Sequence, residues 1–384
     1  MEAGRSMARS ALQSMLGLLE IGYSVSNGIQ ISDKRSKLQG GLPNILVYRP
    51  GQLGDTVCAI PAICAVRENF EPCNLVLLSD AHVYNNYPKA SEILLEFGLI
   101  EEAITYPPDA SFRLYEFLAL RHAIGQRGIN TVFYFAPSGR RFHQKLRDML
   151  FFKWCGIKNI YGLKLQGGEA TNPTTAHETD RLLQILKLDG FKTPTAVRFK
   201  LSISAMARAR VDSLWQDLCL TNKTVIAIGT GSKMPVKRWD EEKYRELGLR
   251  MAASKDMRVL VLGGSEDHPV GERLCEVWNG RGYNLSGKTS YMESAEVLKR
   301  CRLYVGNDNG TMHLAAAVGT PCVAIFSSRD LPGAWYPYGN GHTVFRKDVE
   351  CQGCMLEECV NEKMKCIRSV TVDEVFSACA NYLG

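Results

Sequence analysis

Two aspartates, Asp55 and Asp308, each lie in a glycine-containing turn between an apolar, strand-like stretch and a helix of mostly small and apolar residues. The N–H groups of a first helical turn have no intrahelical partners, and the helix dipole makes them a site for anions such as phosphates. A carboxylate at such a site would repel phosphate, so we expect Asp308 to hold a sugar hydroxyl or to cap its helix. The pattern is typical of a fold that binds a phosphorylated ligand.

Neither turn identifies its ligand by itself. Gly51 and Gly54 lack the spacing of the triple-glycine dinucleotide fingerprint, and no Lys-Ser/Thr pair follows them as it does in a phosphate-binding P-loop. Asp55 has two interpretations, because a carboxylate at a helix start can cap the helix, and in a partly closed cleft it can also take a proton from a hydroxyl.

Strands and helices alternate in both halves of the chain, which predicts an α/β protein with two doubly wound, mostly parallel sheets. Expected strands are 44–49, 74–78, 102–106 and 129–135, then 224–229, 258–262, 303–305 and 321–327; expected helices are 56–69, 111–125, 140–154 and 175–187, then 205–219, 240–253, 270–278, 290–299 and 311–318. Ligands of such sheets bind outside the carboxyl ends of the strands, where both glycine turns lie. We therefore expect a central cleft between two domains, residues 43–200 and 201–384.

Composition narrows the classes of function. The chain has 384 residues, 45% of them hydrophobic, and a net charge of +6. The basic residues are scattered, which argues against nucleic acid as a partner. No apolar run reaches the roughly 18 residues of a membrane-spanning helix, and no signal peptide is recognisable, so we expect a cytoplasmic protein with reduced thiols.

The N-terminal extension, residues 1–42, differs from the rest. Apolar residues between Ala8 and Leu19 recur at helical spacing beside Arg5 and Arg9, which predicts an amphipathic helix, followed by a polar linker at 32–41. The helix would either contact lipid headgroups as a peripheral element or pack on protein.

Four motifs occur in an order and spacing that resemble glycosyltransferase family 9, the family of the ADP-heptose:lipopolysaccharide heptosyltransferases. They are Gly54-Asp55 with Pro61, Lys237-Arg238-Trp239, Gly263-Gly-Ser-Glu266, and Gly306-Asn-Asp-Asn-Gly-Thr-Met-His313 followed by three alanines. The resemblance covers about residues 43 to 380. It implies a GT-B fold, with two Rossmann-like domains facing a central cleft, an acceptor held mainly by the first domain, a nucleotide sugar held by the second, and inverting, metal-independent transfer.

The resemblance also implies roles for individual residues. Asp55 matches the family's proposed general base and Lys237 the lysine near the donor phosphates, while Gly51 and Gly54 belong to the acceptor-side loop. The donor-binding residues would be Ser232, Ser265, Glu266, Asp308, Asn309, Gly310, Thr311, Met312 and His313. Family members typically carry threonine where this chain has Asn309, which leaves the sugar and nucleotide open.

The residues fit this chemistry, with alternatives. Lys237 lies in a generally basic loop and could be merely solvated, and His313 could contact a phosphate or ribose or be structural. A metal could stabilise the departing diphosphate instead, but no Asp-x-Asp pair occurs in the sequence. We therefore expect no cofactor in catalysis.

The C-terminal tail contains Cys351, Cys354, Cys359 and Cys366. Four thiolates at such spacing can close a tetrahedral structural site for zinc or iron, although the second half of the pattern is unlike common zinc ribbons. A structural metal and free thiols both remain open.

The leading hypothesis is an enzyme that transfers a heptose or related sugar from an ADP-heptose-type donor to a lipopolysaccharide core or other surface glycan, in the cytoplasm or peripherally at the inner membrane. The alternatives are a family 9 enzyme that uses a UDP- or GDP-hexose and a non-catalytic protein that binds sugar nucleotides.

Overall fold

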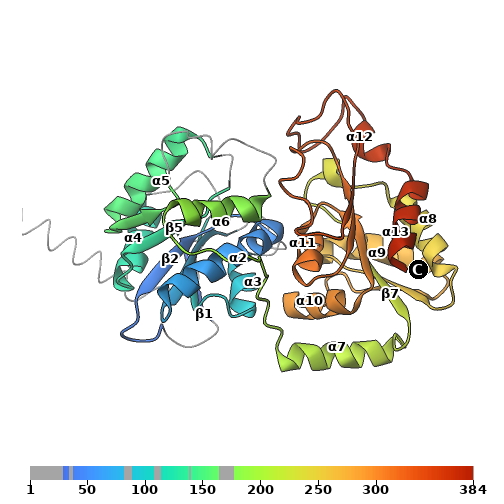
Figure 1. Cartoon of the computed structure of the whole chain (residues 1–384), viewed down its shortest axis with the longest axis horizontal. Coiled ribbons are helices and arrows are strands. Elements are labelled where there is room, and N and C mark those ends of the chain that lie inside the picture. The colour runs from blue at the N-terminus through green and yellow to red at the C-terminus, as the bar shows by residue number, and fades with distance from the viewer. Residues whose placement is uncertain are drawn as a thin grey trace, which may run out of the picture.

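A computed structural model describes residues 29–33, 38–81, 89–107, 114–137, 140–163 and 177–383. Within them the chain forms two six-stranded sheets, each covered by helices (Figure 1). The two domains lie side by side, and the helix that follows the crossover between them, α7 (Ala205–Asp217), runs along one edge of the second domain. The predicted fold class, two doubly wound α/β domains, is confirmed.

The first sheet has the strand order β1-β4-β3-β2-β5-β6, with β1 antiparallel and all other pairs parallel. Its strands are β1 (Gln30–Asp33), β2 (Asn44–Tyr48), β3 (Asn74–Asp80), β4 (Glu102–Tyr106), β5 (Thr131–Tyr134) and β6 (Asn159–Tyr161), and its helices are α2 (Leu53–Phe70), α3 (Ala90–Glu96), α4 (Leu114–Gln126), α5 (Phe142–Trp154) and α6 (Glu178–Leu188). The polar linker predicted at 32–41 is wrong at its start, because residues 32 and 33 belong to β1. The predicted N-terminal helix lies outside the described residues.

The second sheet has the order β12-β11-β10-β7-β8-β9 and is parallel throughout. Its strands are β7 (Thr224–Gly229), β8 (Met257–Val261), β9 (Gly282–Asn284), β10 (Leu303–Asn307), β11 (Cys322–Phe326) and β12 (Thr343–Arg346). The remaining elements are the 3-10 turns η2 (Pro235–Lys237) and η3 (Ser265–Asp267) and the helices α8 (Glu241–Ala252), α9 (His268–Val277), α10 (Tyr291–Arg300), α11 (Gly310–Ala317), α12 (Lys365–Arg368) and α13 (Val372–Leu383).

The central strands consist of apolar residues that are buried on both faces. All five residues of β10 and of β11 are buried, as are four of the five in β2. Continuous burial of this kind is typical of parallel sheets covered by helices on both sides. The apolar residues therefore form the sheet cores and leave the loops at the strand ends to carry polar side chains.

Both sheets reverse their strand order at the places where the candidate residues lie. In the first sheet the reversal falls between β2 and β5, and the loop after β2 leads to Asp55. In the second it falls between β7 and β10, and the loops after these strands carry Ser232 and Asp308. Open α/β sheets bind ligands at such switch points, so the topology positions one candidate loop set in each domain.

The two switch points meet through direct contact of α2 with α11 (Figure 1). A Cβ on Gly54 would lie 2.8 Å from Cδ2 of His313, and a Cβ on Gly310 would lie 2.6 Å from the Leu53 side chain. Glycine is needed at both positions because any side chain would push the helices apart. The domains thus touch at the starts of the two helices that carry the candidate residues. No described helix is long and apolar enough to cross a membrane.

Candidate active site

Asp55 lies in the first turn of α2, where its carboxylate is about a quarter exposed. Its Oδ2 accepts a hydrogen bond from the Gln52 N–H at 3.0 Å, and its side chain is 26% exposed. Gly51 precedes it with φ +137°, and a Cβ there would lie 2.7 Å from the Asp55 Cβ. The Gln52 N–H thus engages Oδ2, while Oδ1 lies 3.6 Å from Arg49 and the carboxylate keeps about a quarter of its surface exposed. Capping and proton transfer can therefore coexist.

A buried ionic network behind Asp55 holds this loop in place. The fully buried guanidinium of Arg49 donates to the Asp55 carbonyl at 2.7 Å and lies 3.6 Å from its Oδ1. The same group donates to Glu178 at 2.8 Å, and Arg181 donates to Glu178 at 2.6 Å. Burial would raise the pKa of Glu178, but the two arginines outweigh burial and lower it. Sequence reasoning missed Arg49 and Glu178, which are 129 residues apart.

In the turn after β10, helix α11 is capped by Asn309 and not by Asp308. Asn309 Oδ1 accepts from the Met312 N–H at 2.9 Å and from the Tyr304 hydroxyl at 3.1 Å, and its Nδ2 donates to the Gly231 carbonyl at 2.7 Å. Of the two sequence interpretations of Asp308, capping is therefore wrong, because its neighbour has the extended backbone of an N-cap. Both the oxygen and the nitrogen of the Asn309 amide are thus engaged in hydrogen bonds within the protein.

Asp308 instead forms an ion pair with Lys237. The ammonium lies 2.5 Å from Asp308 Oδ2 and 2.9 Å from Asp330 Oδ2, and Arg329 donates to Asp330 at 2.7 Å. Burial alone would lower the pKa of Lys237, but the two carboxylates outweigh burial and raise it. Lys237 is thus a largely buried cation at the turn after β10 and not a solvated lysine. Sequence reasoning missed Arg329 and Asp330.

The loops that follow the neighbouring strands β10, β7 and β8 form the second domain's part of the candidate site. The Ser232 hydroxyl donates to the Asp308 carbonyl at 3.2 Å. A Cβ on Gly231 would lie 2.1 Å from Asp267 Oδ1, so the loop after β7 lies against η3, which contains Ser265 and Glu266. Burial, followed by the nearby Glu266, raises the pKa of Asp267 to about 6. The structure therefore brings the predicted donor residues of the second domain to one edge of the sheet.

Asn307 fixes this edge and was not singled out from the sequence. Its Nδ2 donates to the Thr230 carbonyl at 2.6 Å, while its Oδ1 accepts from the Trp239 N–H at 3.0 Å and from the Tyr244 hydroxyl at 2.8 Å. Trp239 is 3% exposed and packs edge-on against Tyr244, as expected for a core residue. A buried asparagine with all of these bonds ties the ends of β7 and β10 together.

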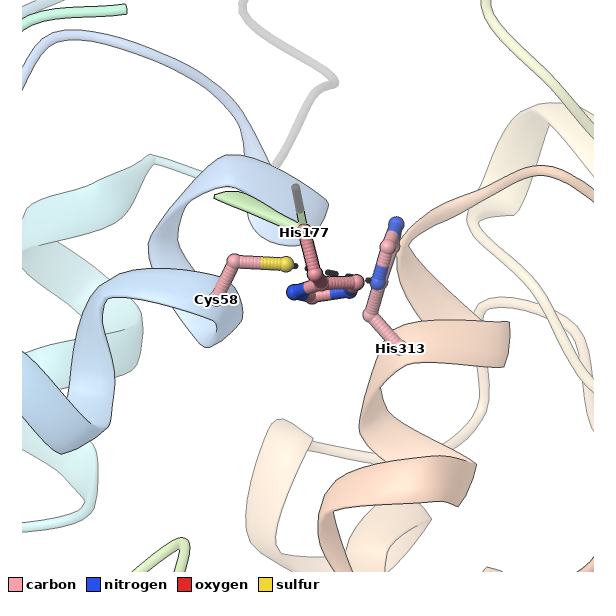
Figure 2. Close-up of side chains that lie close together, drawn as sticks. All are labelled: Cys58, His177 and His313. Atoms are coloured by element: carbon pink, nitrogen blue, oxygen red, sulfur yellow. Dashed lines mark hydrogen bonds between the residues drawn. The ribbon is translucent and has the colours of Figure 1, made fainter. Parts of the chain in front are cut away.

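His313 joins the two halves of the site. Figure 2 shows its ring beside Cys58 of α2 and beside His177, which immediately precedes α6. The Cys58 sulfur lies 3.4 Å from His313 Nδ1, and His313 Nε2 lies 3.9 Å from Asp308 Oδ1. Burial lowers the pKa of His313 to about 3 and raises the pKa of the Cys58 thiol well above its ordinary value. The pair is neutral at physiological pH, with His313 Nδ1 facing α2 of the first domain and Nε2 facing the turn after β10.

The same three residues have the ligand types of a metal site, and one ligand atom from each lies within 4.8 Å of the others. The hydrogen bonds argue against a bound ion. His177 Nδ1 accepts from the Thr179 N–H at 3.0 Å, so Nε2 carries the proton and donates to the Tyr336 carbonyl at 2.8 Å. Neither nitrogen of His177 is left to bind a metal. We interpret the group as an interdomain contact.

We expect the buried neutral His313 to make the protein acid-sensitive. In the unfolded chain the residue gains a proton below pH 6.5, whereas in the folded chain it does so only near 3. Its contribution to stability is therefore fully present above pH 6.5 and is lost as the pH falls, at about 1.4 kcal/mol per pH unit. His313→Gln should reduce the loss of unfolding free energy between pH 7 and pH 5 by about 2 kcal/mol. Urea unfolding at both pH values measures this, with the exposed His122→Gln as control. Equal acid sensitivity of His313→Gln and the native chain would contradict the assignment.

The tail cysteines are not members of this group. Cys359 accepts from the Met364 N–H at 3.4 Å, and Cys366 is buried at the start of α12. Cys351 and Cys354 are half-buried. Among the described residues, the four cysteines do not form a cluster of potential metal ligands such as that of Cys58, His177 and His313. The structural metal at the tail cysteines stays a prediction.

The comparisons with known proteins agree with this geometry. The model of glycosyltransferase family 9 (heptosyltransferase) matches residues 171–365. The lipooligosaccharide heptosyltransferase 2 of Campylobacter jejuni is 24% identical over 351 residues, which cover 88% of this chain and 98% of the relative.

Two solved structures share the fold. The ADP-heptose lipopolysaccharide heptosyltransferase II of Escherichia coli has a TM-score of 0.65 at 18% identity, over 88% of this chain and 98% of that one. A family 9 glycosyltransferase from Veillonella parvula has a TM-score of 0.68 at 18% identity, over 89% and 97% of the two chains. The similarity thus extends over both domains.

Proposed function

Because this chain belongs to glycosyltransferase family 9, the heptosyltransferase family, we propose that it transfers a heptose from an ADP-activated donor to the core of a lipopolysaccharide or lipooligosaccharide. The observation that carries the proposal is the contact of α2 with α11, because it brings the loop of Asp55 and the turn of Asp308 to one place. The names of the relatives support heptose as the sugar and a lipid-linked core as the acceptor.

In the proposed reaction Asp55 takes the proton of an acceptor hydroxyl. The hydroxyl oxygen attacks the anomeric carbon from the face opposite the nucleotide, a new C–O bond forms, and the bond to the diphosphate breaks with its electron pair on the diphosphate. Inversion follows from this single displacement. A carboxylate with one oxygen held by a backbone N–H is preorganised for such a proton transfer.

The developing charge on the diphosphate needs positive groups already in place. The start of α11, the Ser232 hydroxyl and the Lys237 ammonium lie together on the donor side. Asp308, next to Lys237, would hold a hydroxyl of the sugar. We propose that these groups suffice without a catalytic metal or other cofactor.

The donor is water-soluble, whereas the proposed acceptor is a membrane glycolipid. We therefore propose a cytoplasmic enzyme that works in peripheral contact with the inner membrane. The net charge of +6 is compatible with an anionic surface.

The nucleotide tests the proposal. A ligand at a hundred times its Kd stabilises by about 2.7 kcal/mol, so ADP should raise the melting temperature by several degrees and more than UDP or GDP do at equal concentration. Mass spectrometry should then detect the addition of one heptose to a core acceptor when ADP-heptose is supplied. Preferential stabilisation by UDP, or transfer from a UDP-hexose alone, would refute the heptosyl assignment.

A family 9 enzyme that uses a UDP- or GDP-hexose donor is the second candidate function. It was considered because this chain has Asn309 where family members typically carry threonine. The side-chain amide of Asn309 makes three hydrogen bonds within the protein. These bonds explain the asparagine structurally and remove the reason to link it to a different donor sugar. A non-catalytic protein that only binds sugar nucleotides is expected to lack the aspartate of the general base, whereas this chain has Asp55 at that position.

A further inference from the structure

Five large apolar side chains are exposed on α4 and α5, which form part of the cover of the first sheet. Tyr115 and Leu118 of α4 are 51% and 47% exposed, and Phe142, Leu150 and Trp154 of α5 are 58%, 57% and 41% exposed. Tyr115 and Leu118 are three residues apart on α4, and Phe142, Leu150 and Trp154 follow one another at eight and four residues on α5, so on each helix they lie on one side. We call this surface the α4–α5 face.

The two helices form one continuous surface. Phe117 of α4 and Phe151 of α5 pack edge-on with ring centres 5.7 Å apart, and the guanidinium of Arg121 lies over the ring of Trp154 at 4.7 Å. Figure 1 shows both helices on the side of the first domain that points away from the second. Contact between the domains therefore does not cover the α4–α5 face.

The charges of the α4–α5 face have one sign. In the described part of both helices the two carboxylates, Glu116 and Asp148, are 7% and 6% exposed. Asp148 is paired with both Arg140 at 2.6 Å and Arg147 at 2.8 Å. The exposed charged side chains at or beside the apolar ones are Arg121, Arg141, Arg147 and Lys153. An exposed surface with large apolar side chains and only basic charges is complementary to an anionic lipid surface.

We propose that the α4–α5 face docks the enzyme on an anionic phospholipid bilayer. Leu150 and Trp154 enter the interface between headgroups and acyl chains, and the basic side chains pair with lipid phosphates. The inference rests on the proposed function in one respect, because a lipid-linked acceptor gives the docking its purpose.

The α4–α5 face is connected to the catalytic loop. α5 follows the carboxyl end of β5, and Arg140 just before it donates to the Tyr48 hydroxyl at 2.8 Å. Tyr48 is the last residue of β2, whose loop leads to Asp55. The start of α5, with Arg141 and Phe142, therefore lies near the edge of the sheet where the acceptor hydroxyl must arrive, and Leu150 and Trp154 lie toward the other end of the helix.

The test uses the full chain and vesicles of phosphatidylcholine with and without phosphatidylglycerol. Leu150→Gln with Lys153→Gln removes one exposed apolar and one exposed basic side chain of α5. The matched control is Met206→Gln with Arg208→Gln on α7, where both side chains are also exposed. Removing one lysine near an anionic surface lowers binding about fivefold, and losing part of a leucine lowers it further. We expect about tenfold weaker binding of the α5 variant to the anionic vesicles, no more than twofold weakening of the control, and loss of native binding at high salt.

Three outcomes would overturn the proposal. These are absence of binding by the native chain to anionic vesicles, equal weakening by the α7 control, and binding that disappears only when residues 1–28 are removed. A change in sedimentation of the α5 variant would instead assign the α4–α5 face to contact between copies of the chain. ADP binding and transfer to a detergent-dispersed acceptor should stay unchanged in the α5 variant, so failure of docking and failure of the transferase assignment are separate results.

Discussion

Asp55→Asn should lower kcat for transfer by about a thousandfold, which is within the usual contribution of a general base. The amide keeps an oxygen that can accept the Gln52 N–H, so the start of α2 keeps its cap. It cannot take a proton from the acceptor hydroxyl. Because the carboxylate acts on the acceptor, the Kd for ADP should change by less than about twofold. Steady-state kinetics together with calorimetric titration of ADP measure both quantities.

The control for this variant is its melting temperature, which should match that of the native chain. The nearby Arg49–Glu178 pair is buried, and a variant that disturbed it would lose about 3 kcal/mol or more. A folded Asp55→Asn enzyme with kcat within tenfold of the native value would show that another group is the base.

Lys237→Met should weaken ADP binding by about a hundredfold or more. The change removes the cation between Asp308 and Asp330 and leaves two carboxylates facing the incoming phosphates. Charge-assisted contacts of this kind are about twice as strong as neutral hydrogen bonds. Leaving a buried carboxylate without its cation costs about 3 kcal/mol or more in addition. Titration calorimetry with ADP measures the effect.

Two further variants make this result specific. Lys233→Met removes an exposed lysine of the same basic loop and should change ADP binding by less than about threefold. Adding Asp308→Asn to Lys237→Met removes the carboxylate that has lost its lysine partner and should recover part of the lost melting temperature, whereas Asp330 keeps its pair with Arg329. If Lys233→Met weakened ADP binding as much as Lys237→Met, the loop would act only through its overall charge.

Much of the fold could be predicted from the sequence, because its central strands are apolar runs between glycine turns. The strand predicted at 224–229 and the helix predicted at 290–299 agree with β7 and α10 to within one residue at each end. The short edge strands β1, β6, β9 and β12 were missed, since three or four half-exposed residues carry little hydrophobic pattern.

The candidate site was predictable only in part. The motifs identified Asp55, Lys237 and Asp308, because each lies in a turn whose spacing is characteristic. The partners of these residues were not predictable: Asp330 reaches Lys237 from a loop 93 positions further on, and Glu178 reaches Arg49 across 129 positions. Such pairs depend on how the loops fold back on the sheets.

The capping of α11 shows a different limit. Asp308 and Asn309 are adjacent, and both side chains can cap a helix. Only the extended backbone of Asn309 decides which one does so. Local sequence preferences do not distinguish neighbours of equal propensity. The consequence is chemical, because the carboxylate of Asp308 pairs with Lys237 and does not cap the helix.

The most direct test is a crystal structure of the protein with an ADP-heptose analogue that cannot be transferred. We predict the diphosphate at the start of α11 near Ser232 and Lys237, a sugar hydroxyl on Asp308, and a path from the anomeric carbon toward Asp55 with room for one acceptor hydroxyl about 3 to 3.5 Å from the carbon. A nucleotide bound elsewhere, or a sugar that points away from α2, would contradict a single site shared by the two domains.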